Sequence, residues 1–123
     1  MNIHSQKIYD TIVVGAGISG LSAAYHLKKF SPKAEFLVLE GRDNFGGTWD
    51  FFKYPGIRSD SDMHTLGFSF KPWNSRKFIA DGPAIMNYLD ETIEENNLKD
   101  LIKFNMHIES ASWNSVDSLW ELS

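Results

Sequence analysis

The sequence has 123 residues, of which 42% are hydrophobic, and this length allows one modest core but argues against two domains. Its 12 basic and 16 acidic residues give a formal net charge of −4, which argues against nucleic acid as a partner because such proteins usually present a basic face. Cysteine is absent, which excludes disulfides and thiolate metal sites, and no apolar run is long enough to span a bilayer.

The N-terminal third of the chain predicts a strand, a helix and a second strand. The first strand covers 8–14 and ends in β-branched apolar residues, which is typical of a strand buried on both faces. The helix that follows has an apolar face made of Ile18, Leu21, Ala24, Tyr25 and Leu27. Lys28 and Lys29 complement its dipole at the C-terminal end, and Pro32 prevents its continuation. With a second buried strand at 35–40, the three elements form a parallel βαβ unit with a right-handed crossover.

Residues 42–82 differ from what precedes them, because they are rich in Gly, Asp, Ser and aromatic residues and show no sustained period. A stretch of this length without regular structure is uncommon in a compact domain unless it is functional. A second helix follows, with Asp81 as its expected N-cap and Pro83 in its first turn. Its inward-facing residues are Ile85, Met86, Leu89 and Ile93.

The C-terminal part predicts a third strand at 101–104 and an antiparallel hairpin of strands 108–113 and 119–122. The predicted fold class is therefore α/β, with a parallel sheet built on the βαβ unit, to which an antiparallel hairpin or meander is added. The sequence ends at Ser123 in what reads as the middle of a meander, so we expect a truncated domain. The unpaired edge that remains favours pairing into a homodimer.

The glycine motif Gly15-Ala16-Gly17-Ile18-Ser19-Gly20 fits G-x-G-x-x-G and stands directly between the first strand and the first helix. In that context Gly15 permits a tight turn, Gly17 lets a pyrophosphate approach the backbone, and Gly20 lets helix and strand pack closely. Free N–H groups at the helix start bind phosphate oxygens. The alternative is a glycine-rich turn without a ligand, and the correct flanks disfavour it.

Glu40 stands twenty residues after Gly20, at the end of the second strand. A carboxylate there accepts hydrogen bonds from the hydroxyls of an adenosine ribose and repels a 2′-phosphate, which leaves FAD and NAD as candidates. The run Gly46-Gly47-Thr48-Trp49 favours FAD, since two glycines, a hydroxyl and a flat ring suit the extended part of a flavin. An irregular loop with an aromatic plug is the alternative for that run.

A second unusual cluster runs from Tyr54 to Asp62 and reads Tyr-Pro-Gly-Ile-Arg-Ser-Asp-Ser-Asp. Asp60 and Asp62 are candidate N-caps of a short helix that begins at Met63. Arg58 is a candidate phosphate clamp or a partner of Asp60.

These motifs together resemble the N-terminal part of class B flavoprotein monooxygenases, and within them the Baeyer–Villiger branch that includes the ethionamide-activating type. The resemblance covers nearly all of the chain after Tyr9, and 46–73 is its most specific part. It implies that the parent enzyme binds FAD and NADPH and reacts with O2 to form a C4a-peroxyflavin. Such an enzyme inserts oxygen into a ketone or oxidises a sulfide.

The resemblance also implies roles for individual residues. The pyrophosphate would meet Gly15, Gly17, Ser19 and Gly20, and the ribose would meet Glu40. The residues along the flavin would be Gly47, Thr48, Trp49, Asp50 and Phe51. Asp60 would lie near the isoalloxazine, with Arg58, Ser59 and Asp60 near the nicotinamide cofactor, and the backbone of Ile108 would face the adenine.

Departures from the family pattern limit what this chain is expected to do by itself. His64 stands where relatives often have Tyr, and it is interpreted as a packing substitution. A second glycine motif for NADPH, the family fingerprint and the strand that closes the flavin site are all absent from 1–123. We therefore expect residues 1–123 to be the N-terminal part of a Rossmann-like βαβ FAD-binding domain, inactive by itself, with no catalytic residue assigned. The histidines show no metal-ligand spacing, so no metal is expected.

Two other functions remain open at this point. One is a dehydrogenase or reductase linked to FAD or NAD, against which the segments 46–49 and 54–63 argue. The other is a non-enzymatic nucleotide-binding module that dimerises through its exposed strand. Because the first seven residues lack the apolar core of a signal peptide, a soluble, cytoplasmic protein is expected.

Overall fold

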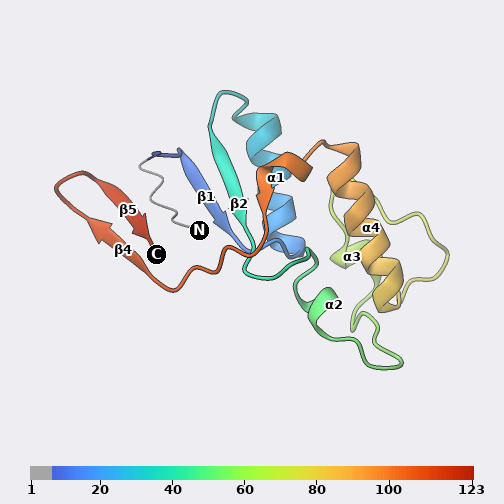
Figure 1. Ribbon diagram of the computed structural model, residues 1–123. Coiled ribbons are helices and arrows are strands. Elements are labelled where there is room, and N and C mark those ends of the chain that lie inside the picture. Colours follow the sequence, from blue (N-terminus) through green and yellow to red (C-terminus); the bar gives the residue numbers. More distant parts are fainter. Residues whose placement is uncertain (1–6) are drawn as a thin grey trace.

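The computed structural model describes residues 7–123. Of the N-terminal stretch considered for a signal peptide, residues 1–6, including His4, lie outside the described residues. The described part begins with a parallel three-stranded sheet in the order β1-β2-β3 (Figure 1). Its strands are β1 (Thr11–Val14), β2 (Phe36–Leu39) and β3 (Ile102–Lys103). Helix α1 (Ile18–Phe30) connects β1 to β2, so the predicted βαβ unit is confirmed.

Strand β1 is less buried than its sequence predicts. Val14 is 61% exposed, and the other residues of β1 are only half-buried. The expectation of a strand buried on both faces is therefore wrong for β1, because β1 lies at an edge of the described sheet and has β2 as its only strand neighbour there. The expectation is right for the central strand β2, where Phe36, Val38 and Leu39 are buried.

Helix α4 (Gly82–Glu95) packs against α1, on the side away from the parallel sheet (Figure 1). Its N-cap is Asp81, as predicted, and the Asp81 Oδ1 accepts a hydrogen bond from the Ala84 N–H at 2.8 Å. The predicted inward residues Ile85, Leu89 and Ile93 are buried, and Met86 is half-buried. Lys28 and Lys29 lie in the last turn of α1, as predicted. Lys28 also donates from Nζ to the carbonyl oxygens of Asn96 and Asn97, the two residues after α4, at 3.0 and 2.9 Å.

The segment 42–82 contains two single-turn helices, α2 (Thr48–Phe51) and α3 (Met63–Leu66), within otherwise irregular backbone. Asp62 caps α3, because its Oδ1 accepts from the Thr65 N–H at 3.0 Å, whereas Asp60 caps no helix. A short 3-10 turn, η1 (Lys99–Leu101), leads into β3. The long irregular stretch predicted here is thus confirmed, with local helical turns inside it.

The C-terminal hairpin consists of β4 (Ala111–Asn114) and β5 (Leu119–Leu122) and extends away from the sheet (Figure 1). The side chain of Asn114 fixes the turn, since its Oδ1 accepts from the N–H groups of Val116 and Asp117 at 3.0 and 3.1 Å. The hairpin is therefore present as predicted, but its first strand begins at Ala111 rather than at Ile108.

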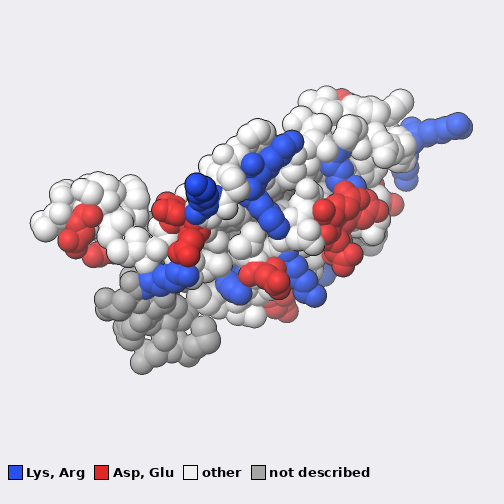
Figure 2. Space-filling model, turned by 90° about the horizontal axis from the view of Figure 1, so that it is seen from above, with Lys and Arg blue, Asp and Glu red and all other residues white. Residues whose placement is uncertain are grey.

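Charged side chains lie in small separate groups of each sign on the face shown in Figure 2. This distribution offers no continuous basic surface on that face for a nucleic-acid backbone. Within residues 7–123, no helix is both long and apolar enough to cross a membrane. The same part of the chain contains no group of three or more His, Asp or Glu side chains arranged to hold a metal ion.

Candidate functional site

The glycine-rich turn between β1 and α1 leaves the start of the helix without a side-chain cap. Gly17 is the N-cap of α1, no side chain accepts from the first turn, and that turn contains no acidic residue. The N–H groups of this turn therefore carry the positive end of the helix dipole without an internal acceptor. An anion such as a phosphate is the ligand that this helix end can bind.

Gly20 sets how closely α1 approaches β1. A Cβ atom built at position 20 would lie 1.9 Å from the carbonyl oxygen of Gly15, which no real structure tolerates. At Gly17, by contrast, a Cβ would meet only the Cα of Gly47, at an ordinary distance of 3.7 Å. Gly20 is thus required by the packing of α1 on its own turn, while no contact within the described chain requires a glycine at position 17.

Gly47 brings the second predicted segment against the first. Its φ of +54° is in the left-handed region, and a Cβ there would lie 3.1 Å from the Cα of Gly17. The Gly46 N–H also donates to the carbonyl oxygen of Ala16 at 2.9 Å. The two glycine-containing turns, far apart in sequence, are therefore in backbone contact, and α2 begins beside the N-terminus of α1.

Glu40 is buried at the end of β2 and holds the glycine-rich turn in place. Its Oε1 accepts from the Ala16 N–H at 2.9 Å, and its Oε2 accepts from the Arg42 N–H at 2.9 Å. An ionised carboxylate has about four acceptor positions, so two bonds leave capacity for the hydroxyls of a ribose. The sequence predicts a ligand-binding role for Glu40 and misses this second role of tying β2 to the turn after β1.

Ile108 lies in the segment after β3, which runs beside the residues following β2. Met106 donates its N–H to the carbonyl of Glu40, and Asn105 donates to that of Arg42, both at 2.9 Å. Two residues further along, Ile108 is half-buried, and its backbone has no hydrogen bond to the rest of 7–123. The structure thus places Ile108 two residues beyond the hydrogen bond between Met106 and Glu40, with a backbone donor and acceptor available.

Helix α2 presents its predicted residues in different directions. Thr48 is exposed, as is Ser19 at the start of α1, and Trp49 packs partly against the core. Asp50 is only 3% exposed and is surrounded by polar partners within the chain. Those partners are Asn44, which donates a hydrogen bond at 2.9 Å, and the cations of Arg42 and Lys53, at 3.0 and 3.5 Å.

Arg42 was not singled out by the sequence, yet it links Asp50 to Phe51. Its Nη1 lies 3.0 Å from Asp50 Oδ2 as an ion pair, without the geometry of a hydrogen bond. Its guanidinium also stands over the ring of Phe51, 5.1 Å from the centroid. Asp50 is therefore a buried carboxylate whose partner, Arg42, is half-buried, while Phe51 remains 62% exposed.

The segment 57–59 pairs with 80–82 immediately before α4. Gly82 donates its N–H to the carbonyl of Ile57 at 3.0 Å, and Ser59 donates to that of Ala80 at 2.8 Å. The buried Ser59 hydroxyl in turn accepts from the Ala80 N–H at 3.1 Å. Ser59 is therefore committed to holding this pairing, whereas Arg58 and Asp60 on either side are exposed. No ion pair joins Arg58 to Asp60 in the described chain, so that alternative is not met.

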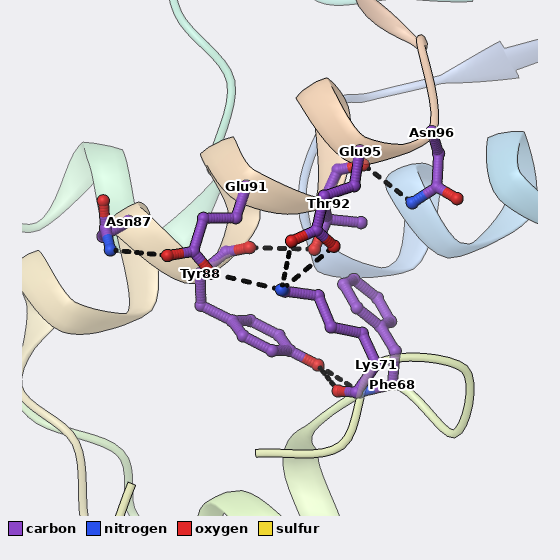
Figure 3. Close-up of polar contacts among 8 residues, drawn as sticks. All are labelled: Phe68, Lys71, Asn87, Tyr88, Glu91, Thr92, Glu95 and Asn96. Atoms are coloured by element: carbon purple, nitrogen blue, oxygen red, sulfur yellow. Dashed lines mark hydrogen bonds and ion pairs between the residues drawn. The ribbon is translucent and has the colours of Figure 1, made fainter. Parts of the chain in front are cut away.

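Tyr88 anchors the far end of the same irregular segment onto α4 (Figure 3). Its hydroxyl accepts from the Phe68 N–H at 2.8 Å and donates to the Lys71 carbonyl at 2.5 Å. The Lys71 ammonium lies 3.1 Å from both Glu91 and Glu95 on α4. The 68–71 turn is thus fixed to α4 through both its backbone and a side chain. Residues 57–71, which include Arg58 and Asp60, are therefore held at both ends: at 57–59 by the pairing with 80–82, and at 68–71 by Tyr88 and the Lys71 ion pairs.

An open cleft of about 1040 Å³ lies beyond Trp49, between the loop after α2 and the start of α4. Of the predicted site residues only Trp49 and Arg58 line it. The structure brings Gly15–Gly20, Gly47 and Glu40 together at the carboxyl ends of β1 and β2, and it places Trp49 and Arg58 at the cleft. Of the other predicted residues, Asp50 and Ser59 are buried among the chain's own partners, Thr48, Phe51 and Asp60 are exposed outside the cleft lining, and Ile108 follows β3. The cleft residues Lys77, Phe78 and Met86 were missed, since no spacing pattern connects them to the rest.

Comparison with known proteins gives both a domain family and a set of longer relatives. Residues 13–92 match the model of the NAD(P)-binding Rossmann-like domain. The chain is 52% identical over 115 residues to the FAD-containing monooxygenase EthA of Mycolicibacterium smegmatis, and 51% identical over 115 residues to a probable FAD-binding monooxygenase AlmA of an Acinetobacter species. Each alignment covers 94% of this chain and 23% of the relative, so the chain spans about a quarter of the length of these curated relatives.

Solved structures give the same result. An oxidised steroid monooxygenase bound to NADP superposes with a TM-score of 0.84 at 31% identity, covering 93% of this chain and 22% of that one. The closed structure of cyclohexanone monooxygenase gives a TM-score of 0.82 at 29% identity, covering 94% and 22%. The Rossmann-like fold with its added hairpin and the resemblance to flavin-dependent monooxygenases of the Baeyer–Villiger type are therefore confirmed.

Proposed function

Because the chain belongs to the family of NAD(P)-binding Rossmann-like domains, we propose that it is the N-terminal, FAD-binding part of an FAD- and NADPH-dependent monooxygenase. In this proposal, residues 1–123 are one part of an FAD-binding domain. The relatives of this chain are named as FAD-containing or FAD-binding monooxygenases, and one similar solved structure is described as a complex with FAD and NADP. When bound, FAD would take a hydride from NADPH and pass electrons to O2, so that one oxygen atom enters a ketone or sulfide and the other leaves as water.

The residues fit the adenosine half of FAD. The observation that carries the proposal is the buried Glu40 carboxylate, which lies against the Ala16 N–H at the uncapped start of α1. Glu40 would accept from both hydroxyls of the adenosine ribose, while the α1 turn with Gly15, Gly17 and Ser19 would bind the pyrophosphate. The backbone of Ile108 would then bind the adenine edge.

The predicted residues from Gly47 to Asp60 would border the flavin and the nicotinamide cofactor. Gly47 and Thr48 begin α2 beside Gly17, which would place Trp49 and Phe51 further along the same ligand. Arg58 and Asp60 would lie near the nicotinamide cofactor, held by the buried Ser59. We assign Asp50 the role of positioning α2 through Arg42, since its carboxylate is enclosed by the chain's own partners.

A pair of flavins tests the adenosine site directly. FAD and FMN share the isoalloxazine, but only FAD contains the adenosine ribose that Glu40 would bind. In Glu40→Gln we expect FAD affinity to fall by about tenfold or more, the effect of losing hydrogen bonds to a charged group, with FMN affinity unchanged. Binding is measured by flavin fluorescence anisotropy, with Glu94→Gln as the matched surface control.

Equal affinities of the wild type for FAD and FMN would contradict the site, as would an equal loss of both flavins in Glu40→Gln. Because Glu40 also supports the glycine-rich turn, urea unfolding of the variant shows whether the fold persists. Gly17→Ala, which meets no close contact inside the chain, provides a second and structurally milder test. We expect it to weaken FAD selectively as well.

We further propose that the chain by itself does not turn over. Steady NADPH oxidation by the purified 123-residue protein with excess FAD is expected to stay at the background rate of free flavin. Consumption above that background would contradict this expectation. It would also favour the second candidate, a reductase, if no oxygenated ketone or sulfide formed.

A non-enzymatic module that dimerises through its hairpin is the remaining candidate. One observation favours it: Trp113 and Trp120 form a cross-strand pair on the hairpin and are 52% and 64% exposed. Such exposed aromatic pairs commonly mark an interaction surface. Under this proposal the hairpin would pair with that of a second copy.

A further inference from the structure

The two walls of the cleft beside α2 come from different parts of the chain. One wall is Trp49 with the loop 52–58, and the other is 77–79 with the start of α4 at 81–83 and Met86. The walls are held together by the pairing of 57–59 with 80–82, and by a 2.7 Å bond from the Met63 N–H to the Phe78 carbonyl. The cleft is therefore a built part of the fold.

Large apolar side chains are concentrated in this cleft and face solvent there. Phe52, Tyr54 and Phe78 are 48%, 58% and 57% exposed, and all three line it. Rings left open in a cleft are the feature by which proteins bind the apolar body of a small molecule. Most of the described chain's other aromatic rings are packed against one another or the core.

The cations of the cleft are not balanced by its acids. Lys53 is paired with Asp50 at 3.5 Å, but Arg58 and Lys77 have no carboxylate within ion-pair distance among residues 7–123. The acid that lines the cleft, Asp81, already accepts from the Ala84 N–H as the cap of α4. A guanidinium and an ammonium are thus available beside exposed rings.

We propose that this cleft binds a small carboxylate with an aromatic or alkyl body. The body lies against Phe52, Tyr54 and Phe78, and the carboxylate pairs with Arg58 and Lys77. As a statement of substrate class this rests on the proposed function, since a ketone or sulfide bearing an acid group would then be preferred. The binding itself requires neither FAD nor turnover.

Arg58 is also proposed to lie near the nicotinamide cofactor, so the oxyanion it binds has a second source. The phosphates of NADP+ would use the same guanidinium. They are attached to polar riboses, and the adenine and nicotinamide rings carry polar groups for which the rings of Phe52 and Phe78 supply no hydrogen-bond partner. The lining of the cleft therefore favours the carboxylate, and NADP+ enters the test as a competitor.

Two matched ligands test the proposal on the 123-residue chain. Phenylbutyrate and phenylbutyramide have the same apolar body, but one ends in a charged carboxylate and the other in a neutral amide. Each is titrated into the 15N-labelled protein at neutral pH and followed by NMR. Changes in the NMR chemical shifts of the backbone amides of Ile57 and Ile79 and of the Trp49 indole N–H report binding in the cleft, because all three residues line it. We expect the carboxylate to bind about fivefold more tightly than the amide, as suits exposed ion pairs, with shifts confined to the cleft.

Variants separate the two halves of the site. Arg58→Gln combined with Lys77→Gln is expected to abolish the preference for the acid while the amide binds as before. Phe78→Ala is expected to weaken both ligands equally. The exposed Lys33→Gln, far from the cleft in sequence and in a different loop, serves as the charge control.

Equal binding of acid and amide by the wild type would overturn the proposal, and so would the absence of shifts at the three reporters. A third contrary result is that NADP+ shifts these reporters while phenylbutyrate does not. A failed phenylbutyrate titration with a normal FAD-to-FMN difference at Glu40 would remove this inference alone. The reverse pattern would remove the FAD site and leave the cleft.

Discussion

Two glycines of one motif have different reasons to be glycine. At Gly20 the limit is the protein itself, because a Cβ would collide with the Gly15 carbonyl. At Gly17 the described chain leaves room for a methyl group. A glycine that internal packing does not require is a candidate for close approach by a ligand, and the proposed FAD would bring its pyrophosphate to this position.

Alanine at these two positions should therefore destabilise the fold to different extents. Gly20→Ala is expected to lower the free energy of unfolding by about 3 kcal/mol, since α1 must move away from its turn. Gly17→Ala is expected to cost about 1 kcal/mol or less. Urea unfolding monitored by circular dichroism measures both values. Equal destabilisation by the two substitutions would contradict the distinction.

The residue scale also shows where prediction from sequence stops. Spacing alone identified Glu40 and the glycines, because the βαβ unit fixes where the ends of its strands meet. It did not show that Glu40 and Asp50 are also internal anchors, since the partners Arg42 and Asn44 follow no motif. Which groups pair with these carboxylates depends on the folded conformation of irregular loops, and no local sequence pattern describes that conformation.

At the scale of elements, α4 is the part that fixes the functional loops. Tyr88 is 4% exposed and both accepts from the Phe68 N–H and donates to the Lys71 carbonyl (Figure 3). The rings of Tyr25, Phe70, Phe68 and Tyr88 stack successively from α1 to α4. The loop between Leu66 and Trp73 is thus fastened to two helices at once.

Removing the Tyr88 hydroxyl tests this anchor. In Tyr88→Phe the ring stays, but the buried Phe68 N–H loses its acceptor. We expect a loss of about 1 to 3 kcal/mol in the free energy of unfolding, the usual cost of an unsatisfied buried donor. Tyr54→Phe, which changes an exposed tyrosine, is the control and should be neutral. Thermal or urea unfolding that does not separate the two variants would contradict the anchor.

The same network predicts a loss of stability at alkaline pH. Burial alone would lower the pKa of Lys71, but its hydrogen bonds to Glu95 and Glu91 outweigh burial and raise that pKa above its ordinary 10.5. Burial raises the pKa of Tyr88 above 10.0, against the opposing Phe68 N–H and Lys71 charge. Groups whose pKa is raised on folding stabilise the fold below their unfolded pKa values, and that contribution is lost as pH rises through the folded values.

We therefore expect unfolding free energy to fall as the pH rises above about 10, where unfolded tyrosine and lysine begin to lose their protons. The double variant Tyr88→Phe, Lys71→Gln should show a smaller fall over the same range, although it is less stable at neutral pH. Urea unfolding between neutral and strongly alkaline pH measures this slope. Parallel pH profiles of wild type and double variant would contradict the assignment.

The elements that sequence predicted well are those with local signals at their ends. Asp81 and Pro83 mark the start of α4, and the Asn114 turn joins the two strands of the hairpin. Predictions of burial failed where burial depends on neighbouring elements. Val14 is apolar, but its sequence does not indicate that β1 lies at the edge of the described sheet, where Val14 is exposed. The cleft could not be predicted either, because its two walls, within 49–58 and 77–86, are separated in the sequence by residues 59–76.

At the scale of the whole molecule, the hairpin is the part with the least internal support. Every residue of β4 and β5 is exposed or half-buried, and the hairpin stands away from the sheet (Figure 1). The Trp113 and Trp120 rings contact each other with centroids 5.5 Å apart. An aromatic pair of this kind on a free hairpin is a favourable surface for association with a second copy.

We expect the purified chain to form a reversible dimer whose fraction rises with concentration in sedimentation equilibrium. Replacing both tryptophans, Trp113→Thr with Trp120→Thr, should give a monomer, because threonine keeps the strand propensity and removes the apolar surface. Phe30→Ser removes an equally exposed ring from the end of α1 and should leave the dimer intact. A wild-type chain that stays monomeric across the concentration range would contradict the dimer, and with it the candidate function as a dimeric module. The proposed FAD site at Glu40 would be unaffected by that result, because hairpin and proposed site share no residue.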